Sequence, residues 1–283
     1  MELLQFDFMQ RALVAGLITA LVCPLIGIFV VVRRQAMIGD GLGHIAFAGI
    51  MGGYVLNIYP TFVAALVTML GAGGIEFVRR KHIRYADTSL AIFFYSGIAL
   101  AVIFSSMAKV PGNGIIGVLF GSILTVTATD LWLIGACALL VLAVMARCFY
   151  KLMLMSFDEE VAKVAGINTA VVGVVFSMMT ALVVVVGMRI VGILLVSSLM
   201  IIPVAASQLL RVGFKATLGW AVVFSVISVW GGLVLSFYLD IAPGGTIVMM
   251  AVAIYLLLLV GADGLLFKWL KPRRVNPVSG QER

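Results

Sequence analysis

Charged residues are scarce in this chain. Only 11% of its 283 residues are Asp, Glu, Lys or Arg, whereas a soluble domain has about 25%. Hydrophobic residues make up 63%, and the mean hydropathy is +1.22. The apolar runs are too long and too evenly spread for the core of a soluble domain. The composition therefore excludes a soluble protein and predicts an all-α polytopic membrane protein.

The signatures of enzymes are also missing. The sequence contains no Gly-x-x-x-x-Gly-Lys-Ser/Thr phosphate loop, no His-Glu-x-x-His motif and no pair of catalytic carboxylates. Its three cysteines have neither metal-finger nor redox spacing. The polar segments are too short to hold a nucleotide-binding domain. We therefore expect a protein that is not an enzyme, holds no permanent cofactor, and obtains any ATP hydrolysis from a separate subunit.

Apolar runs separated by short polar segments fill the chain instead. A membrane core of about 30 Å needs about 20 helical residues. The segment 115–126 is too short for that and is predicted to be a half-helix. About nine transmembrane helices are expected in a single domain, 1–283, with a polar segment at 151–167 and a tail at 268–283. The predicted spans are 11–32, 38–56, 61–78, 87–107, 130–149, 169–187, 190–210, 216–239 and 245–267.

The basic residues indicate the orientation. Of the 19 Lys and Arg residues, 16 lie at the span ends and loops that share one side of the membrane. The exceptions are Arg11, Lys109 and Arg189. Such loops face the cytoplasm, which places the N-terminus outside and the C-terminus inside a cell membrane. The formal charge of +7 thus follows membrane topology and forms no single patch. This distribution argues against nucleic acid as a partner and for a lipid membrane.

Asp40 and His44 are the candidate metal ligands. Residues four apart lie on one face of a helix, and ionisable groups inside a membrane segment are functional candidates by default. Carboxylate and imidazole both bind zinc and other first-row metals. A second copy of the chain, related by a twofold axis, would supply another Asp-His pair and bring the number of ligands to four. The alternative is structural, with Asp40 capping the helix and His44 bonded to a neighbour. A helix continuing from Arg34 would place them about 9 Å and 15 Å further along.

The polar segment 151–167 has the signals of a short helix. Acidic residues favour a helix N-terminus and glycine favours its end, so we expect a helix between Asp158 and Gly166. Its apolar side chains are Phe157, Val161 and Val164. An amphipathic helix of this kind suits the docking of a soluble partner, although an ordinary loop helix has the same pattern.

A third feature is the apolar run that contains Pro203, which is expected to kink a helix. Ser197, Ser198 and Ser207 in this run either line a transport pathway or satisfy backbone groups at the kink; taken singly, each serine favours the second interpretation. Elsewhere, Glu76 near a span end is expected to snorkel or to pair with a neighbouring arginine.

Three stretches carry a family resemblance: residues 24–44 with Gly39-Asp40-Gly41-Leu42-Gly43-His44, Asp87-Thr88, and residues 191–206 with Ile202-Pro203-Val204-Ala205-Ala206. Together they resemble the membrane permease subunit of metal-ion ABC importers of the zinc/manganese type, most closely the zinc permeases of Gram-positive bacteria. The resemblance covers essentially the whole chain except the tail. One departure is Gly43, where this family commonly has serine before its histidine.

The resemblance implies a bacterial permease that works as a homodimer. A cytoplasmic ABC ATPase dimer would dock on the coupling segment, with Asp158, Glu159, Ala162 and Gly166 as its residues. An extracellular or periplasmic metal-binding protein would deliver the ion. Asp40 and His44 match the positions that hold the transported metal in the family.

The function expected is import of Zn²⁺ by alternating access, with Mn²⁺ or another divalent ion as the alternative. A secondary transporter driven by an ion gradient remains a second class. It would need further carboxylates at mid-membrane and often has inverted repeats, and neither is evident. A permease for iron chelates or cobalamin would need a wider polar lining than this chain offers.

Overall fold

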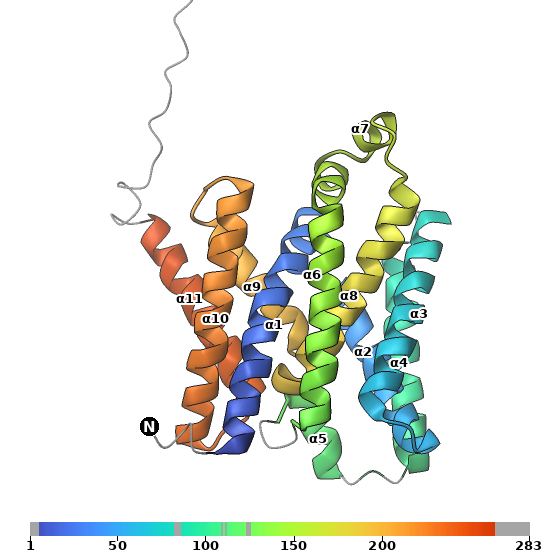
Figure 1. Cartoon of the computed structure of the whole chain (residues 1–283), viewed down its shortest axis with the longest axis vertical. Helices are drawn as coiled ribbons and strands as arrows, with labels where there is room; N and C mark the ends of the chain where they lie inside the picture. The colour runs from blue at the N-terminus through green and yellow to red at the C-terminus, as the bar shows by residue number, and fades with distance from the viewer. Residues whose placement is uncertain (1–5, 82–85, 109, 111, 123–125, 264–283) are drawn as a thin grey trace, which may run out of the picture.

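The computed structural model describes residues 6–81, 86–108, 110, 112–122 and 126–263 (Figure 1). The predicted tail at 268–283 lies outside these residues. In the described part the chain forms eleven helices and no strand. They are α1 (Asp7–Val32), α2 (Ile38–Leu56), α3 (Pro60–Lys81), α4 (Ala86–Ala108), α5 (Gly112–Phe120), α6 (Ala128–Phe157), α7 (Glu159–Val164), α8 (Thr169–Val191), α9 (Val196–Gln208), α10 (Phe214–Leu239) and α11 (Pro243–Asp263).

Seven of the helices in the described residues are long and apolar enough to cross a membrane, namely α1, α3, α4, α6, α8, α10 and α11. The predicted all-helical fold with several apolar spans is therefore confirmed. α2 has 19 residues at the predicted bounds, but Asp40, His44 and its glycines lower its hydropathy. Two helices without a full-length apolar window, α2 and α9, supply the candidate site.

The predicted span 190–210 is not one helix. α8 continues to Val191, and α9 begins only at Val196 and has 13 residues. At 1.5 Å per residue α9 is about 20 Å long, shorter than the membrane core of about 30 Å. The chain breaks at Gly192, whose φ is +92°. A positive φ ends the helix here, where glycine adopts it without a steric penalty.

α5 closes this break with its own backbone. The amide groups of Ile193 and Leu194 donate to the carbonyls of Val118 and Leu119, each at 3.2 Å. Gly192 permits the approach, because a Cβ there would lie 2.4 Å from the carbonyl oxygen of Leu119. Non-helical backbone inside a membrane protein must be hydrogen-bonded in this way. The expected half-helix exists, at Gly112–Phe120 in place of 115–126.

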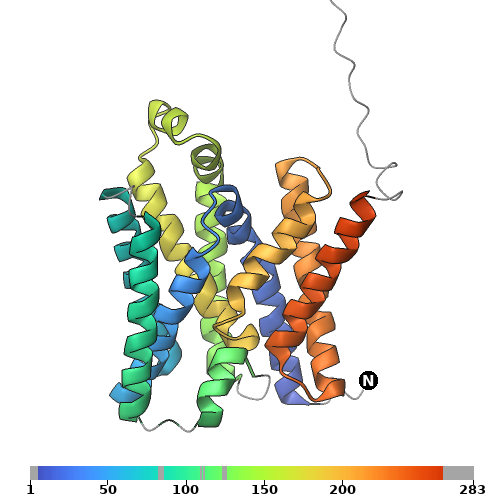
Figure 2. The same cartoon turned by 180° about the vertical axis from the view of Figure 1, so that it is seen from behind.

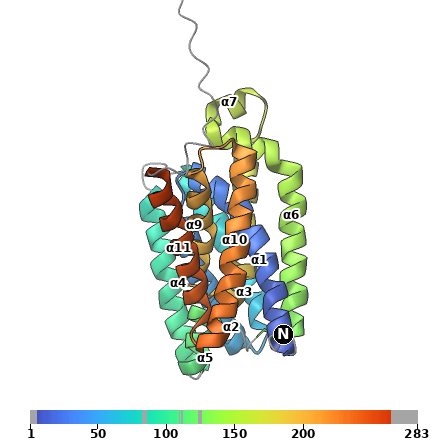
Figure 3. The same ribbon diagram turned by 90° about the vertical axis from the view of Figure 1, so that its left-hand side faces the viewer.

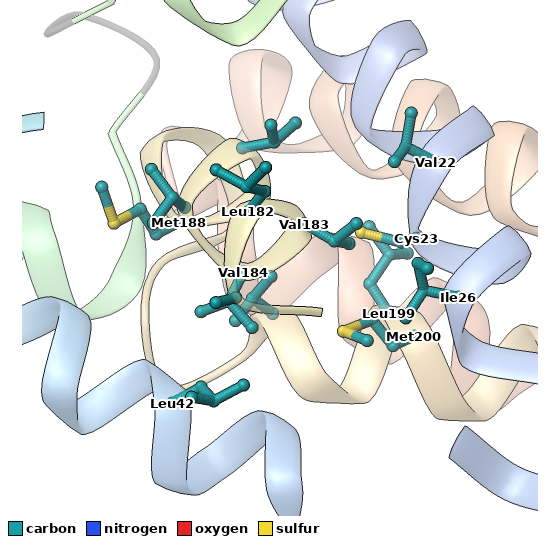
Figure 4. Close-up of a cluster of buried hydrophobic side chains, with 14 of the residues drawn as sticks. Val22, Cys23, Ile26, Leu42, Leu182, Val183, Val184, Met188, Leu199 and Met200 are labelled. Carbon is teal, nitrogen blue, oxygen red and sulfur yellow. The ribbon is translucent and has the colours of Figure 1, made fainter. Parts of the chain in front are cut away.

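The helices form a bundle in which α1 and α8 are the most buried of the candidate spans (Figure 1). In side view, α4 and α6 lie at opposite edges, with α1 and α10 between them (Figure 3). α2 packs against α3 and α4 on one side, and α10 packs against α1, α9 and α11 on the other. The core between α1, α2, α8 and α9 is built from aliphatic and sulfur-containing side chains (Figure 4). They include Val22, Cys23, Ile26, Leu42, Leu182, Val183, Val184, Met188, Leu199 and Met200.

α7 projects from one end of the bundle, which is called here the α7 end (Figure 2). α1 begins at the opposite end, and α11 finishes at the α7 end (Figures 1 and 2). The turn between α1 and α2 and the last turn of α3 also lie at the α7 end. The basic residues at this end include Arg33, Arg34, Arg79, Arg80, Lys163 and Arg211.

Candidate functional site

Asp40 and His44 lie on α2, one turn apart. α2 begins at Ile38, because the chain turns at Arg34, whose φ is +55°. Counted from Ile38, Asp40 is about 3 Å and His44 about 9 Å along the helix. The expected depths of about 9 and 15 Å assumed an uninterrupted helix and are therefore too large. Asp40 belongs to the first turn of α2, near the α7 end.

The carboxylate of Asp40 accepts a hydrogen bond from a side chain of α9. The hydroxyl of Ser197 donates a hydrogen bond to Oδ1 of Asp40. Gly39 allows the two helices to meet, since a Cβ there would lie 2.8 Å from the Cβ of Ser197. Ser197 therefore contacts the candidate ligand, and the prediction that it satisfies the backbone at the proline kink is wrong. Met37, the N-cap of α2, makes no side-chain cap bond.

His44 lies against α4. Its ring meets the ring of Phe94 edge-on, with 4.3 Å between the centroids. Gly97 lets the backbones approach, because a Cβ there would lie 2.8 Å from the carbonyl carbon of His44. Nδ1 of His44 is buried and has no hydrogen-bond partner among the described residues. A buried nitrogen without a partner is costly, and a neutral imidazole nitrogen is a metal ligand.

One chain supplies only part of a metal site. Within the described residues, no three His, Cys, Asp or Glu side chains come together to hold a metal. Zinc in proteins takes four ligands, or three plus a water or substrate. As candidate ligands, Asp40 and His44 would thus fill only part of such a set in a single chain.

The other residues singled out in α9 have different roles. Ser207 donates to the carbonyl of Val204 at 2.7 Å, as the backbone interpretation predicted. Pro203 lies inside α9, which remains helical around it. Ser198 is partly buried in the first turn of the same helix.

The coupling segment has the predicted helix. Asp158 caps α7, with its carboxylate accepting from the amides of Glu160 and Val161 at 2.9 and 3.0 Å. Gly166 follows the helix with φ +78°, and Ala162 is fully buried. The hydrogen bond from Lys163 to Glu160 raises the pKa of Lys163. The predicted apolar residues Phe157, Val161 and Val164 are all exposed; docking on them stays a prediction.

Glu76 pairs with neighbouring arginines, which was one of the two predictions for it. Its carboxylate lies 2.8 Å from Arg79 and 2.9 Å from Arg80. Glu76 is only 1% exposed and also accepts from Ser177 on α8 at 3.3 Å. Arg80 donates further to the carbonyl of Thr169, the first residue of α8. The end of α3 is thereby tied to the start of α8.

A second buried ion pair was missed at the far end. Arg189 on α8 lies 3.0 Å from Asp130 on α6. Thr61 at the start of α3 donates to Asp130 at 3.0 Å and accepts from Nε of Arg189 at 3.0 Å. One signal was present in the sequence, because Arg189 is one of three basic residues outside the predicted cytoplasmic loops. Its partner Asp130 lies 59 positions earlier, and no local sequence pattern indicates that the two residues pair.

The comparison with known families decides the classification. A family model described as "ABC 3 transport family" matches residues 5–262. The chain belongs to this family. The family resemblance that the sequence motifs carry is thereby confirmed.

Curated relatives differ in the metal that their names state. The chain is 36% identical to the "Probable metal transport system membrane protein" of Treponema pallidum, covering 91% of this chain and 96% of the relative. It is 28% identical to the manganese transport system membrane protein MntC of Halalkalibacterium halodurans, over 98% and 96% of the two chains. It is 30% identical to the high-affinity zinc uptake system membrane protein ZnuB of Haemophilus influenzae, over 89% and 97%.

A solved structure has the same fold. It is titled PsaBC from Streptococcus pneumoniae in complex with Fab, with a TM-score of 0.82 and 26% identity. The match covers 90% of this chain and 92% of that chain. The bundle described above is thus the fold of a permease in this family. Because the named relatives include both a manganese and a zinc system, they do not favour zinc.

Proposed function

We propose that this chain is the transmembrane permease subunit of an ABC importer and moves Zn²⁺ through a site formed by Asp40 and His44. The observation that carries the proposal is the pair itself. A carboxylate and an imidazole with a free buried nitrogen share one face of α2, in a chain of this transport family. Mn²⁺ is the alternative substrate.

The ligand set supports zinc over manganese. Two chains related by a twofold axis would bring two Asp40 and two His44 residues to one ion. Four ligands of nitrogen and oxygen suit the tetrahedral preference of zinc. Manganese favours octahedral sites rich in oxygen and would need further ligands from water. The two-ligand set of one chain supports a homodimer as the working unit.

The α7 end would face the cytoplasm and receive the ATPase dimer. α1 then begins outside and α11 ends inside. α2, and the short α9 together with the bonded break before it, would complete nine crossings of a bacterial cytoplasmic membrane. A metal-binding protein would deliver the ion at the opposite end. Exposed Val161 and Val164 on α7 offer the apolar surface for the ATPase.

A physical connection leads from α7 to the metal site. α8 begins at Thr169, five residues beyond the end of α7. On α3, Arg80 donates a hydrogen bond to the carbonyl of Thr169, and Glu76 accepts one from the hydroxyl of Ser177. α3 packs in turn against α2. A movement of α7 on ATP binding would therefore shift α8 and α3 together and move Asp40 and His44 on α2, which is the requirement of alternating access.

Growth rescue on a panel of metals tests this function. The chain is expressed with its ATPase and binding protein in cells that lack high-affinity zinc and manganese uptake. Wild type should restore growth in chelated medium at low zinc and accumulate zinc. Asp40→Asn and His44→Gln should each lower uptake on the order of 100-fold, with unchanged copurification of the ATPase.

Asp240→Asn is the matched control. Asp240 is exposed at the end of α10 with φ +52°, a conformation that asparagine also adopts. Metal uptake by the Asp240→Asn variant should equal that of wild type. Rescue by manganese alone would establish the alternative substrate. Wild-type zinc and manganese uptake in both site variants would disprove the site.

A further inference from the structure

A basic pocket opens at the α7 end, beside the metal site. Its volume is about 200 Å³, and it lies between the ends of α1 and α3 and the starts of α2 and α4. Arg33, Arg34 and Arg79 line it together with Gln35, and its apolar wall includes Met37 and Leu90. Three arginines thus line one small space.

Glu76, the carboxylate beside this pocket, balances only part of its positive charge. Glu76 pairs with Arg79, which lines the pocket, and with Arg80, and it accepts from Ser177. Among the described residues, neither Arg33 nor Arg34 forms a salt bridge. Nη1 of Arg33 is buried and has no hydrogen-bond partner in the described structure. Burial first, and then repulsion from Arg79, lower the pKa of Arg33 to about 10. The pocket therefore keeps excess positive charge, carried by Arg33 and Arg34.

An apolar groove continues from the basic pocket along α4. Its volume is about 290 Å³, and it shares Met37 and Leu90 with the basic pocket. From there it follows Ala91, Phe94 and Tyr95. Tyr95 is 68% exposed, so the groove opens on the outer surface of the bundle. A charged pocket at the end of a membrane helix is thus joined to an apolar channel along that helix.

We propose that this combined site binds an anionic phospholipid, with the phosphate headgroup among Arg33, Arg34 and Arg79 and an acyl chain along the α4 groove. Arginine binds phosphate through paired, charge-assisted hydrogen bonds. Basic pockets between helices on the cytoplasmic side are typical headgroup sites. A zwitterionic lipid would bring its own cation into the pocket, and inorganic phosphate would leave the groove empty.

The bound lipid would contact residues that support α2. Leu90 packs against α2 at Gly41, where a Cβ would lie only 2.9 Å from Cδ1 of Leu90. Phe94 holds the ring of His44 edge-on. The lipid would therefore stabilise the α4 wall of the candidate metal site. The lipid site itself does not depend on which ion is transported.

Lipid retention by the purified complex tests the headgroup. The permease is purified with its ATPase, exchanged into nanodiscs of phosphatidylglycerol or phosphatidylcholine, and transferred to detergent. Bound lipid is then counted by native mass spectrometry. Wild type should retain phosphatidylglycerol and not phosphatidylcholine. Arg34→Gln should lower this retention about tenfold, the effect of losing a charged hydrogen bond.

Arg211→Gln is the matched control, because Arg211 is exposed at the α7 end and has φ +52°, against +55° for Arg34. Both variants lose one charge at the same backbone conformation, and only Arg34 lines the pocket. Retention should be unchanged in Arg211→Gln. Equal retention in the two variants, or equal retention of both lipids by wild type, would overturn the proposal.

A second pair of variants tests the groove. Ala91→Trp fills it and should lower lipid retention, whereas Ile103→Trp on the exposed face of α4 outside the groove should not. Displacement of the lipid by millimolar inorganic phosphate would identify a free anion as the occupant. A disulfide between two copies of Tyr95→Cys would show that a second chain covers the groove. Either result contradicts the lipid site.

Discussion

Ser197 and Asp40 are 157 positions apart in the chain, and the hydroxyl of Ser197 donates a hydrogen bond to the Asp40 carboxylate. The bond joins the first turn of α9 to the first turn of α2. α9 starts directly after the break at 192–195, which α5 holds through backbone hydrogen bonds. One oxygen of the candidate metal ligand is thus oriented by the discontinuous part of the bundle.

Ser197→Ala should therefore weaken metal binding without removing a ligand. Groups that orient a metal ligand contribute about 10–100-fold to affinity, and we expect a loss in that range. The measurement is zinc binding by the purified complex, together with KM for uptake. Ser197→Thr keeps the hydroxyl and should recover most of the affinity.

Ser207→Ala is the control for this prediction, because the hydroxyl of Ser207 bonds the carbonyl of Val204 in the same helix. Its zinc affinity should equal wild type. If both serine variants bound zinc like wild type, the hydrogen bond to Asp40 would have no part in the site.

The ion pair of Arg189 and Asp130 should contribute to stability. Asp130 is 1% exposed, and removing one member of a buried pair costs about 3–5 kcal/mol, because the other charge stays buried. Asp130→Asn should thus lower the melting temperature of the purified complex markedly. The double variant Asp130→Leu with Arg189→Met removes both charges and should recover part of the loss. A double variant less stable than the single one would contradict this account.

Gly192 should not tolerate a side chain. Its φ is +92°, and a Cβ would lie 2.4 Å from the carbonyl oxygen of Leu119. Gly192→Ala should therefore separate α5 from the break and destabilise the protein by more than the conformational cost alone. Gly166→Ala isolates that cost, because Gly166 has φ +78° and nothing within 4 Å of a Cβ. Gly166→Ala should lower the free energy of unfolding by about 1–3 kcal/mol. Equal melting temperatures for the two variants would show that the contact with α5 is unimportant.

Val164→Glu should release the ATPase. Val164 is 90% exposed on α7, so the change leaves the permease fold intact while placing a charge on the predicted docking surface. Burying that charge at an interface should cost about 2 kcal/mol or more of binding energy, which pull-down of the ATPase can measure. Ile241→Glu, exposed at the opposite end, is the control. An undiminished yield of ATPase with Val164→Glu would place the docking surface elsewhere.

Local patterns account for the parts of the fold that the sequence predicted well. α2 was expected at 38–56 and occupies Ile38–Leu56, because apolar periodicity and polar ends act within one helix. The cap of α7 at Asp158 and the turn at Gly166 depend on residues within a few positions. The common face of Asp40 and His44 follows from helical spacing in the same way.

The break at Gly192 shows where such reasoning fails. Residues 190–210 are apolar throughout except for their serines and Gln208, so their composition is that of a continuous span. The break exists because α5, more than 70 positions earlier, bonds to the chain at Ile193 and Leu194. Composition carries no information about a backbone hydrogen bond between distant segments.

The sequence by itself determined that this protein is a membrane bundle, and that α2 carries a carboxylate and an imidazole one turn apart. Both follow from hydropathy and helical periodicity, which are local. Only the tertiary structure decided that Asp40 is bound by Ser197, that Arg189 pairs with Asp130, and that Arg33 lies in a pocket continuous with the α4 groove. These contacts depend on which helices pack together, and packing joins residues that no spacing along the chain relates.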